Sequence, residues 1–160
     1  MATWADVRRI VKSLPGTSEG VSHGNNSWNV QGKAFLWERP LRESDILALG
    51  DQAPTGEILA ARVESLLVKE SALRESTDYF FTTPHFDGYP AILVQLKRIP
   101  VNRLQDLLEQ AWLSRAPKRM ADEFRGGAPV TRAGTGTSKA GKRKSEKPSP
   151  TKISRPLKTK

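Results

Sequence analysis

Two histidines are the side chains of this sequence best suited to proton transfer or metal binding. His23 stands beside Gly24, and His85 follows Pro84 with Asp87 two residues further along. An imidazole can serve as a general base, a metal ligand or a hydrogen-bond donor near neutral pH. The alternative is that each ring only hydrogen-bonds the backbone of its own turn. No serine, lysine or carboxylate completes a triad with either histidine at a diagnostic spacing, so we expect no catalytic residues and no metal site.

Other routes to catalysis are also missing from the sequence. The chain has no cysteine, which excludes a thiolate nucleophile, disulfides and zinc sites built on sulfur. The string from Gly136 to Arg143 approaches a P-loop, but Arg143 replaces the required serine or threonine and no strand precedes it. We therefore expect a protein that is not an enzyme and that uses no cofactor.

Aromatic and basic residues could instead form a binding surface. Most aromatic rings of a small domain build its core, but Trp28 and Tyr89 adjoin turns and are expected to be exceptions. Rings next to cations can stack with nucleic-acid bases. A cluster near residue 118 could contact phosphate, or it could only complement the negative end of a last helix. The candidate DNA- or ligand-binding residues are His23, Trp28, Lys33, Arg39, His85, Asp87, Tyr89, Arg115, Lys118 and Arg119.

Helices and short strands must position these residues. Thr3 and Asp6 are spaced to cap a first helix whose apolar stripe runs from Trp4 to Leu14. A last helix is predicted to begin at an Asn102 cap, with Gln105 at the third position. Between them we expect strands over 19–23, 27–30, 34–38, 58–63, 79–82 and 91–96, a helical turn over 44–49 and a helix over 65–74, with a further turn or two over 118–124.

The charge of the chain is unevenly distributed. The formal net charge is +9, from 26 basic and 17 acidic residues. Residues 126–160 hold ten of the basic residues and one acid, Glu146, so residues 1–125 hold 16 of each sign. The later segment consists mainly of small, polar and basic residues, which cannot bury enough apolar surface to fold. We therefore expect one folded domain over 1–125 and a disordered basic tail over 126–160.

The tail is suited to electrostatic attraction by polyanions. A flexible cationic segment binds nucleic-acid phosphates without sequence preference and with strong salt dependence. Its Ser149-Pro150-Thr151-Lys152 is similar to the tail repeats of linker-histone-like proteins, although a tail that only aids solubility is the alternative. The expected phosphate contacts are Lys139, Lys142, Arg143, Lys144, Lys147, Lys152, Arg155, Lys158 and Lys160.

Several separated motifs in the domain are distinctive. They are Leu14-Pro15-Gly16-Thr17 with Glu19-Gly20, Ser22-His23-Gly24, Gly32-Lys33 with Phe35-Leu36-Trp37-Glu38-Arg39-Pro40-Leu41, Phe80-Phe81-Thr82-Thr83-Pro84-His85-Phe86-Asp87-Gly88-Tyr89-Pro90, Ala111-Trp112-Leu113 and Ala116-Pro117-Lys118-Arg119. In this order, over about residues 4 to 124, they resemble the MmcQ/YjbR family. The resemblance implies a frataxin-like α+β "double-wing" fold, in which an antiparallel sheet is packed by N- and C-terminal helices. It also implies DNA binding.

These observations give two functional hypotheses. The first is a non-enzymatic cytoplasmic protein that could associate with the nucleoid. In this hypothesis the tail attracts DNA and the domain adds shape recognition. The second is a module for a small-molecule or protein partner, with its site around His23, Trp28, His85, Asp87 and Tyr89 and an incidental tail. No apolar run approaches the roughly 20 residues of a membrane span, so no membrane partner is expected. A monomer is favoured.

Overall fold

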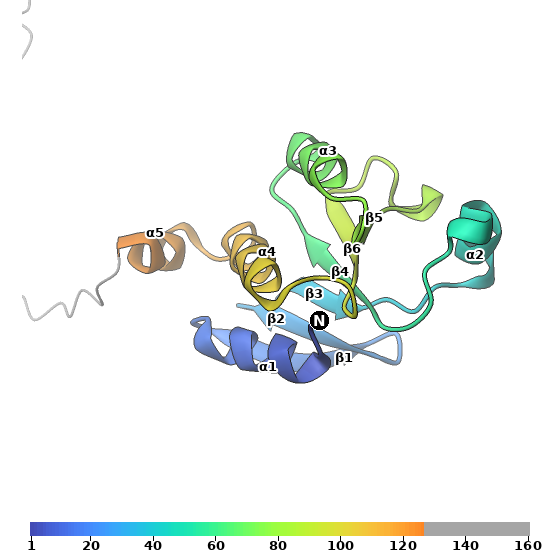
Figure 1. The fold of residues 1–160 in the computed structure, drawn as a ribbon. Coiled ribbons are helices and arrows are strands. Elements are labelled where there is room, and N and C mark those ends of the chain that lie inside the picture. Colours follow the sequence, from blue (N-terminus) through green and yellow to red (C-terminus); the bar gives the residue numbers. More distant parts are fainter. Residues whose placement is uncertain (127–160) are drawn as a thin grey trace, which may run out of the picture. The chain divides into compact units, whose positions relative to one another are not determined.

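The fold is known from a computed structural model that describes residues 1–126 of the 160-residue chain (Figure 1). The predicted disordered tail and its phosphate contacts lie outside the described residues. The elements are α1 (Trp4–Ser13), β1 (Thr17–Ser22), β2 (Asn25–Val30), β3 (Lys33–Glu38), α2 (Glu43–Leu49), the 3₁₀ turn η1 (Gly50–Gln52), β4 (Ile58–Arg62), α3 (Leu66–Glu75), β5 (Phe80–Phe81), the 3₁₀ turn η2 (Pro84–Phe86), β6 (Ala91–Gln95), α4 (Val101–Leu113) and α5 (Lys118–Gly126).

The strands form one six-stranded sheet in the order β1-β2-β3-β4-β6-β5, and every neighbouring pair is antiparallel. This confirms the predicted α+β class. Two-residue turns join the first three strands, and all four turn residues have positive φ: His23 (51°), Gly24 (80°), Gln31 (49°) and Gly32 (77°). Positive φ at both central positions defines the type I′ turn, whose twist matches that of paired strands.

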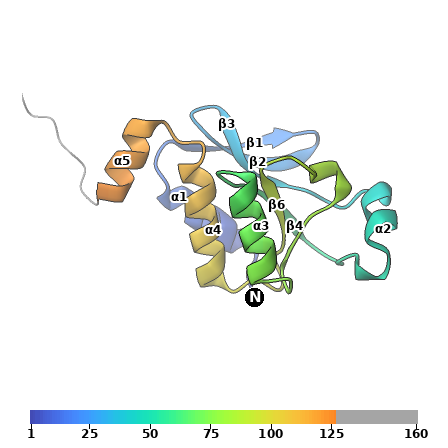
Figure 2. The same ribbon diagram turned by 90° about the horizontal axis from the view of Figure 1, so that it is seen from above.

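Helices α1, α3 and α4 pack on the first face of the sheet (Figures 1 and 2). Thr3 and Asp6 form the predicted reciprocal capping box at the start of α1. The apolar stripe of α4 is buried as expected, through Leu104, Leu107, Leu108, Ala111 and Trp112. These side chains meet alternate residues of β4 and β6, such as Leu59 and Ile92, in the main core. Apolar burial is the dominant favourable contribution to folding, so this face carries most of it.

The second face of the sheet has a much smaller apolar cluster. Its buried members are Ile58, Ala60, Phe86, Ala91 and Leu93. Trp37, Leu41 and Phe81 pack against them while remaining partly exposed. Both figures show α2 on long connections, apart from the other helices, and its only buried side chain is Asp45. The second face is therefore covered by loops rather than by a helical layer.

Three local predictions were wrong. The second strand begins at Asn25, not at residue 27, because the His23-Gly24 turn needs only two residues. The last long helix begins at Val101 with Pro100 as its N-cap, and Asn102 lies inside it. Proline is favoured near a helix start because its φ is preset and it has no N–H to satisfy. Trp28, predicted to be accessible, is 1% exposed and stacks on Trp4 in the main core.

No helix among residues 1–126 is long and apolar enough to cross a membrane.

Candidate functional site

A cavity of about 640 Å³ on the second face of the sheet contains both histidines. Three separate segments line it: the β1–β2 hairpin with the adjoining strands, β3 with the chain after it, and the 84–89 segment. The lining residues are Ser22, His23, Asn25, Ser27, Ala34, Trp37, Glu38, Arg39, Arg42, His85, Phe86 and Tyr89. We call this the hairpin cavity.

The hairpin cavity exists because the residues that face it on the first two strands are small. Gly20 pairs with Ser27, and Ser27 pairs with Trp37 across the sheet. Glycine and serine leave the sheet surface low at the point where no helix covers it. Trp37 and the 84–89 segment then form one wall, and the hairpin tip with His23 forms another. The open sheet face thus becomes a pocket rather than a flat surface.

Arg39 fixes the aromatic wall from behind. Its side chain is 9% exposed, its Nη2 lies 2.9 Å from Asp45 Oδ2, and its guanidinium lies 5.5 Å from the centre of the Phe86 ring. Burial by itself raises the pKa of Asp45. The hydrogen bond from the Arg42 backbone N–H and the contacts with Arg39 outweigh burial and hold that pKa below its usual 3.8. The pair therefore stays ionised and attaches α2 to the wall.

A buried lysine holds the 84–89 segment from the other side. Lys69 is the only buried residue of α3, and its Nζ donates hydrogen bonds to the carbonyl oxygens of Phe86 and Tyr89. Burial lowers the pKa of Lys69 below its usual 10.5, and the charge of Asp87 opposes that shift. The segment's backbone is thus anchored to a helix rather than left as a free loop.

The sequence-predicted candidates are brought together only in part. His23, Arg39, His85 and Tyr89 line the hairpin cavity, and Tyr89 is 44% exposed. Asp87 lies in the same segment but outside the lining. The remaining candidates lie elsewhere: Trp28 in the core, Lys33 in the β2–β3 hairpin, Arg115 with its Nε donating to the carbonyl of Ala34, and Lys118 and Arg119 on α5.

The cluster around residue 118 was placed at the wrong end of a helix. Lys118 and Arg119 open α5, where the helix dipole disfavours positive charge, instead of closing the last helix. Each pairs with an acid four residues on, at 2.8 Å for Lys118–Asp122 and 3.1 Å for Arg119–Glu123. These local pairs offset much of the positive charge that a phosphate would meet.

Sequence reasoning missed several residues of the cavity. Trp37 and Phe86 were assigned to the core with the other aromatics, and Ser27, Glu38 and Arg42 were not singled out. A usable signal was present in the sequence, because small or polar residues stand at 22, 25 and 27, and the strand that pairs with β2 ends in Trp37-Glu38. An antiparallel sheet can leave one face uncovered, and that face then carries small and polar residues.

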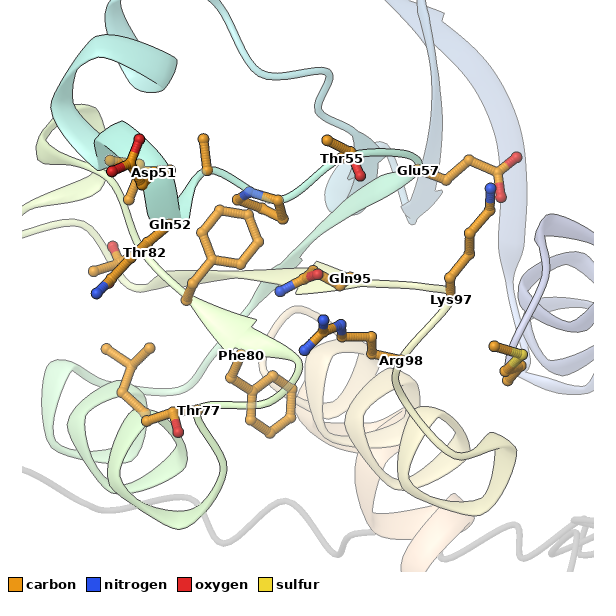
Figure 3. A pocket seen from close by; sticks show the side chains of 16 residues that line it. Asp51, Gln52, Thr55, Glu57, Thr77, Phe80, Thr82, Gln95, Lys97 and Arg98 are labelled. Carbon is orange, nitrogen blue, oxygen red and sulfur yellow. The ribbon is translucent and has the colours of Figure 1, made fainter.

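A larger cavity, of about 910 Å³, lies beside β5 and the start of β4. Figure 3 shows Gln95 and Arg98 extending into it, with Asp51, Glu57 and Lys97 also on its lining. It contains none of the candidate residues, and its charged side chains are all exposed. Phe80, which is 5% exposed, also lines it, so aromatic lining does not distinguish the two cavities. The hairpin cavity is the one on which the predicted candidate residues converge, and we therefore assign the candidate site to it.

No group of three or more histidine, aspartate or glutamate side chains among residues 1–126 is arranged to hold a metal ion.

Comparison with known proteins identifies relatives but no function. No family model matches the chain. The uncharacterized proteins Mb2600 of Mycobacterium bovis and Rv2570 of Mycobacterium tuberculosis are each 47% identical to it over 127 residues, which cover 78% of this chain and 96% of each relative.

One solved structure has the same fold. The crystal structure of Deinococcus radiodurans protein DR2400, a DUF419 domain, matches with a TM-score of 0.55 and 18% identity, covering 81% of this chain and 91% of that one. DUF419 is the MmcQ/YjbR-like family. The chain therefore belongs to one family with these uncharacterized mycobacterial proteins, and residues 1–126 have the fold of a DUF419 domain.

Proposed function

We propose that residues 1–125 form a binding module that is not an enzyme, and that its ligand occupies the hairpin cavity. The observation that carries this proposal is convergence: residues near 23, 38 and 86, distant in sequence, line one cavity of about 640 Å³. Small-molecule sites usually measure roughly 300–1,000 Å³ and combine aromatic walls with a few polar groups. The hairpin cavity has that size and that composition.

Binding is favoured over catalysis because no second side chain among residues 1–126 hydrogen-bonds and orients either histidine ring. A general base is usually oriented by a second group that hydrogen-bonds its other ring nitrogen. Within residues 1–126, neither the His23 nor the His85 imidazole hydrogen-bonds a carboxylate or any other side chain. Their rings are free to contact a ligand. His85 packs edge-on against Phe86, with the ring centres 5.1 Å apart.

We further propose that the protein is a member of the MmcQ/YjbR family. The motifs around Leu14, Gly32 and Phe80 support this, since they follow in the family's order, and the likeness to a DUF419 fold agrees with it. The family's DNA-binding label is not used to assign the cavity, because a fold does not determine a function.

A ligand screen with matched variants tests the binding proposal. The full-length protein is screened by thermal shift against nucleotides, metabolites and metal ions. A cavity ligand is expected to raise the Tm of wild type and of Lys33→Ala, whose exposed side chain lies in the β2–β3 hairpin outside the lining, but not of Tyr89→Ala. Ligands that stabilise Tyr89→Ala as much as wild type, or a screen without any ligand, would contradict the proposal.

A second candidate function is DNA association through the basic segment. The charge distribution favours it, because residues 126–160 hold the whole net charge of +9. Within the described part, by contrast, Arg39, Lys118 and Arg119 are each paired with an acid. We therefore propose that any phosphate attraction comes from the segment after residue 125, as a salt-sensitive and sequence-independent interaction.

DNA titrations at two salt concentrations separate this function from cavity binding. Full-length protein and a chain ending at Arg125 are compared on the same duplex. The full-length protein is expected to lose affinity steeply with salt, and the shorter chain to bind weakly at both concentrations. Equal affinity of the two proteins would exclude the tail as the DNA-binding element.

A further inference from the structure

Three aromatic rings form one wall of the hairpin cavity. The Trp37 and Phe86 ring centres lie 6.4 Å apart with a 31° interplanar angle, and those of Phe86 and Tyr89 lie 6.1 Å apart at 52°. Offset and tilted arrangements of this kind are the favourable geometries for aromatic contacts. A planar ring inserted beside them gains contact area that a branched aliphatic molecule does not.

Tyr89 is held by Arg62 and remains partly exposed at the cavity. The Arg62 guanidinium lies 4.6 Å from the ring centre on one side. Arg62 is not part of the cavity lining, whereas Tyr89 is, and Tyr89 is 44% exposed, so part of this residue stays accessible at the cavity. A cation against one face of a tyrosine fixes the ring. The backbone of Tyr89 is fixed as well, by Lys69.

The polar groups of the cavity offer both donors and acceptors. Each imidazole, at His23 and His85, presents one donor and one acceptor when neutral. Ser27 adds a buried hydroxyl, and its residue is 4% exposed. Glu38 accepts from the backbone N–H and the side-chain amide of Asn26, at 3.2 and 2.7 Å, which leaves further lone pairs on its carboxylate. Such a set matches a ring edge that carries both donors and acceptors.

The charges of the lining nearly cancel. Arg39 is neutralised by Asp45, so Glu38 and Arg42 are the opposite charges that remain on the described lining. A cavity without strong net charge does not select a polyphosphate or a polyamine. It suits a ring that is uncharged or carries a single charge.

We propose that the hairpin cavity binds a flat nitrogen heterocycle of the nucleobase type. This inference rests on the proposed function, and it names the chemical class of the ligand. The ring inserts beside Phe86 and Tyr89, and its edge hydrogen-bonds His23, His85 and Ser27. The same ring chemistry is presented by a free nucleoside and by an unpaired base in a nucleic-acid strand.

The two histidines provide a direct readout, because the chain has only two and both line the cavity. NMR signals of the imidazole Cε1–H groups are recorded on the full-length protein during titration with four nucleosides, with ribose and with an aliphatic carboxylate. Ring currents of a bound base are expected to shift both signals saturably. Tyr89→Ala is expected to weaken binding about tenfold or more, because base stacking on an aromatic side chain contributes at this level.

Control variants and other ligands make the outcomes distinguishable. Tyr89→Phe keeps the ring and should retain binding, as should Leu67→Ala, which removes a side chain that is 77% exposed and lies outside the cavity. If only the carboxylate or ribose shifts the histidine signals, the proposed binding function is supported but the proposed heterocyclic ligand is wrong. If no compound shifts them, both proposals fail.

Oligonucleotides distinguish a free nucleoside from an unpaired base in a nucleic-acid strand as the ligand. Short single strands and duplexes of the same sequence are titrated with the same readout. Shifts that need Tyr89 and occur with single strands but not with duplexes identify an unpaired base. Shifts with nucleosides but not with strands identify a free nucleoside. Equal shifts with duplex and single strand would overturn base recognition, because paired bases cannot enter the cavity.

Discussion

The two faces of the sheet are built from different interactions. The first face is covered by α1, α3 and α4, and its core contains large fully buried side chains such as Trp28, Leu108 and Trp112. On the second face, five apolar residues are buried. There α2 buries only Asp45, and α3 reaches the 84–89 segment through Lys69, its only buried residue.

This difference separates stability from the geometry of the cavity. Apolar contacts are numerous and non-directional, so they stabilise the fold without fixing any one loop. Hydrogen bonds and ion pairs are directional. On the second face, the Arg39–Asp45 pair and the two hydrogen bonds of Lys69 each involve a residue of the cavity lining. The second face therefore buries less apolar area than the first, and its directional contacts fix the geometry of the residues around the hairpin cavity. Variants on each face should affect stability and binding to different degrees.

The largest effect on stability is expected from truncating a tryptophan of the first face. Trp112 is fully buried, and its Nε1 donates to the carbonyl oxygen of Pro15 at 3.0 Å. Trp112→Ala removes the ring and leaves that carbonyl without its partner. The free energy of unfolding should fall by about 4 kcal/mol, measured by urea denaturation.

The control for this variant is Leu67→Ala, on the exposed side of α3. Its free energy of unfolding should lie within about 0.5 kcal/mol of wild type. At temperatures where Trp112→Ala is folded, its histidine signals should match those of wild type. Altered signals would show that the two faces are not independent.

Breaking the buried pair on the second face is expected to have the next largest effect. Asp45→Asn leaves the guanidinium of Arg39 buried without a counter-charge, which costs about 3 kcal/mol. The double variant Arg39→Met/Asp45→Leu should cost much less, because it removes both charges. A double variant as unstable as Asp45→Asn would show that lost packing, rather than the unpaired charge, causes the loss of stability.

Acid titration gives the same pair a second test. The pKa of Asp45 is held below 3.8 in the folded protein, although burial alone would raise it. Its stabilising contribution is therefore complete above the unfolded pKa and is lost as the pH falls through the lower folded value. Wild type should lose stability in that acid range by more than Asp45→Asn does, and parallel curves would contradict this assignment.

Much of the first face was predictable from the sequence, because helical periodicity and caps are local. The Thr3–Asp6 capping box and the stripe of α4 around Leu108 were both confirmed. The turn positions of His23 and His85 were also readable from their glycine and proline neighbours. These features depend on residues within one or two turns of each other.

The second face was less predictable, because its interactions join segments far apart in the chain. Nothing near Lys69 in the sequence indicates that its amine will meet carbonyls 17 and 20 residues later. Trp37 lies on the cavity wall and Trp28 lies in the core, yet both stand in short β-prone runs of the sequence. Only the strand register decides which face each ring occupies: Trp28 pairs with Leu36 in the main core, and Trp37 pairs with Ser27 on the cavity face.

A smaller loss of stability is expected from removing the anchor of the 84–89 segment. Lys69→Met keeps most of the apolar stem but leaves the carbonyls of Phe86 and Tyr89 without a donor, which costs about 2 kcal/mol. The same variant should weaken cavity binding, because the wall is no longer fixed. The exposed lysine variant Lys33→Ala should change neither quantity.

The pH dependence of this variant can be predicted in sign. Burial lowers the pKa of Lys69 below 10.5 in the folded state. Between that lowered value and 10.5 the unfolded chain binds more protons at this position, so the contribution of Lys69 to stability increases with pH. The gap in unfolding free energy between wild type and Lys69→Met should widen as the pH rises over this range. A gap that narrows would mean that the pKa is raised instead.

The smallest effect on stability, and the sharpest on the cavity, is expected at the hairpin tips. His23 and Gln31 occupy the same first position of two type I′ turns, with φ of 51° and 49°, but only His23 lines the cavity. Asparagine and histidine both adopt this left-handed conformation more readily than glutamine. His23→Asn should therefore leave the free energy of unfolding within about 0.5 kcal/mol of wild type, and Gln31→Asn should leave it unchanged or raise it slightly. Because neither substitution is expected to destabilise its turn, weaker ligand binding in His23→Asn but not in Gln31→Asn reports the loss of the imidazole. Isothermal titration with a ligand that binds wild type should show weaker binding for His23→Asn only. Equal affinities of the two variants would show that the His23 imidazole does not contact the ligand.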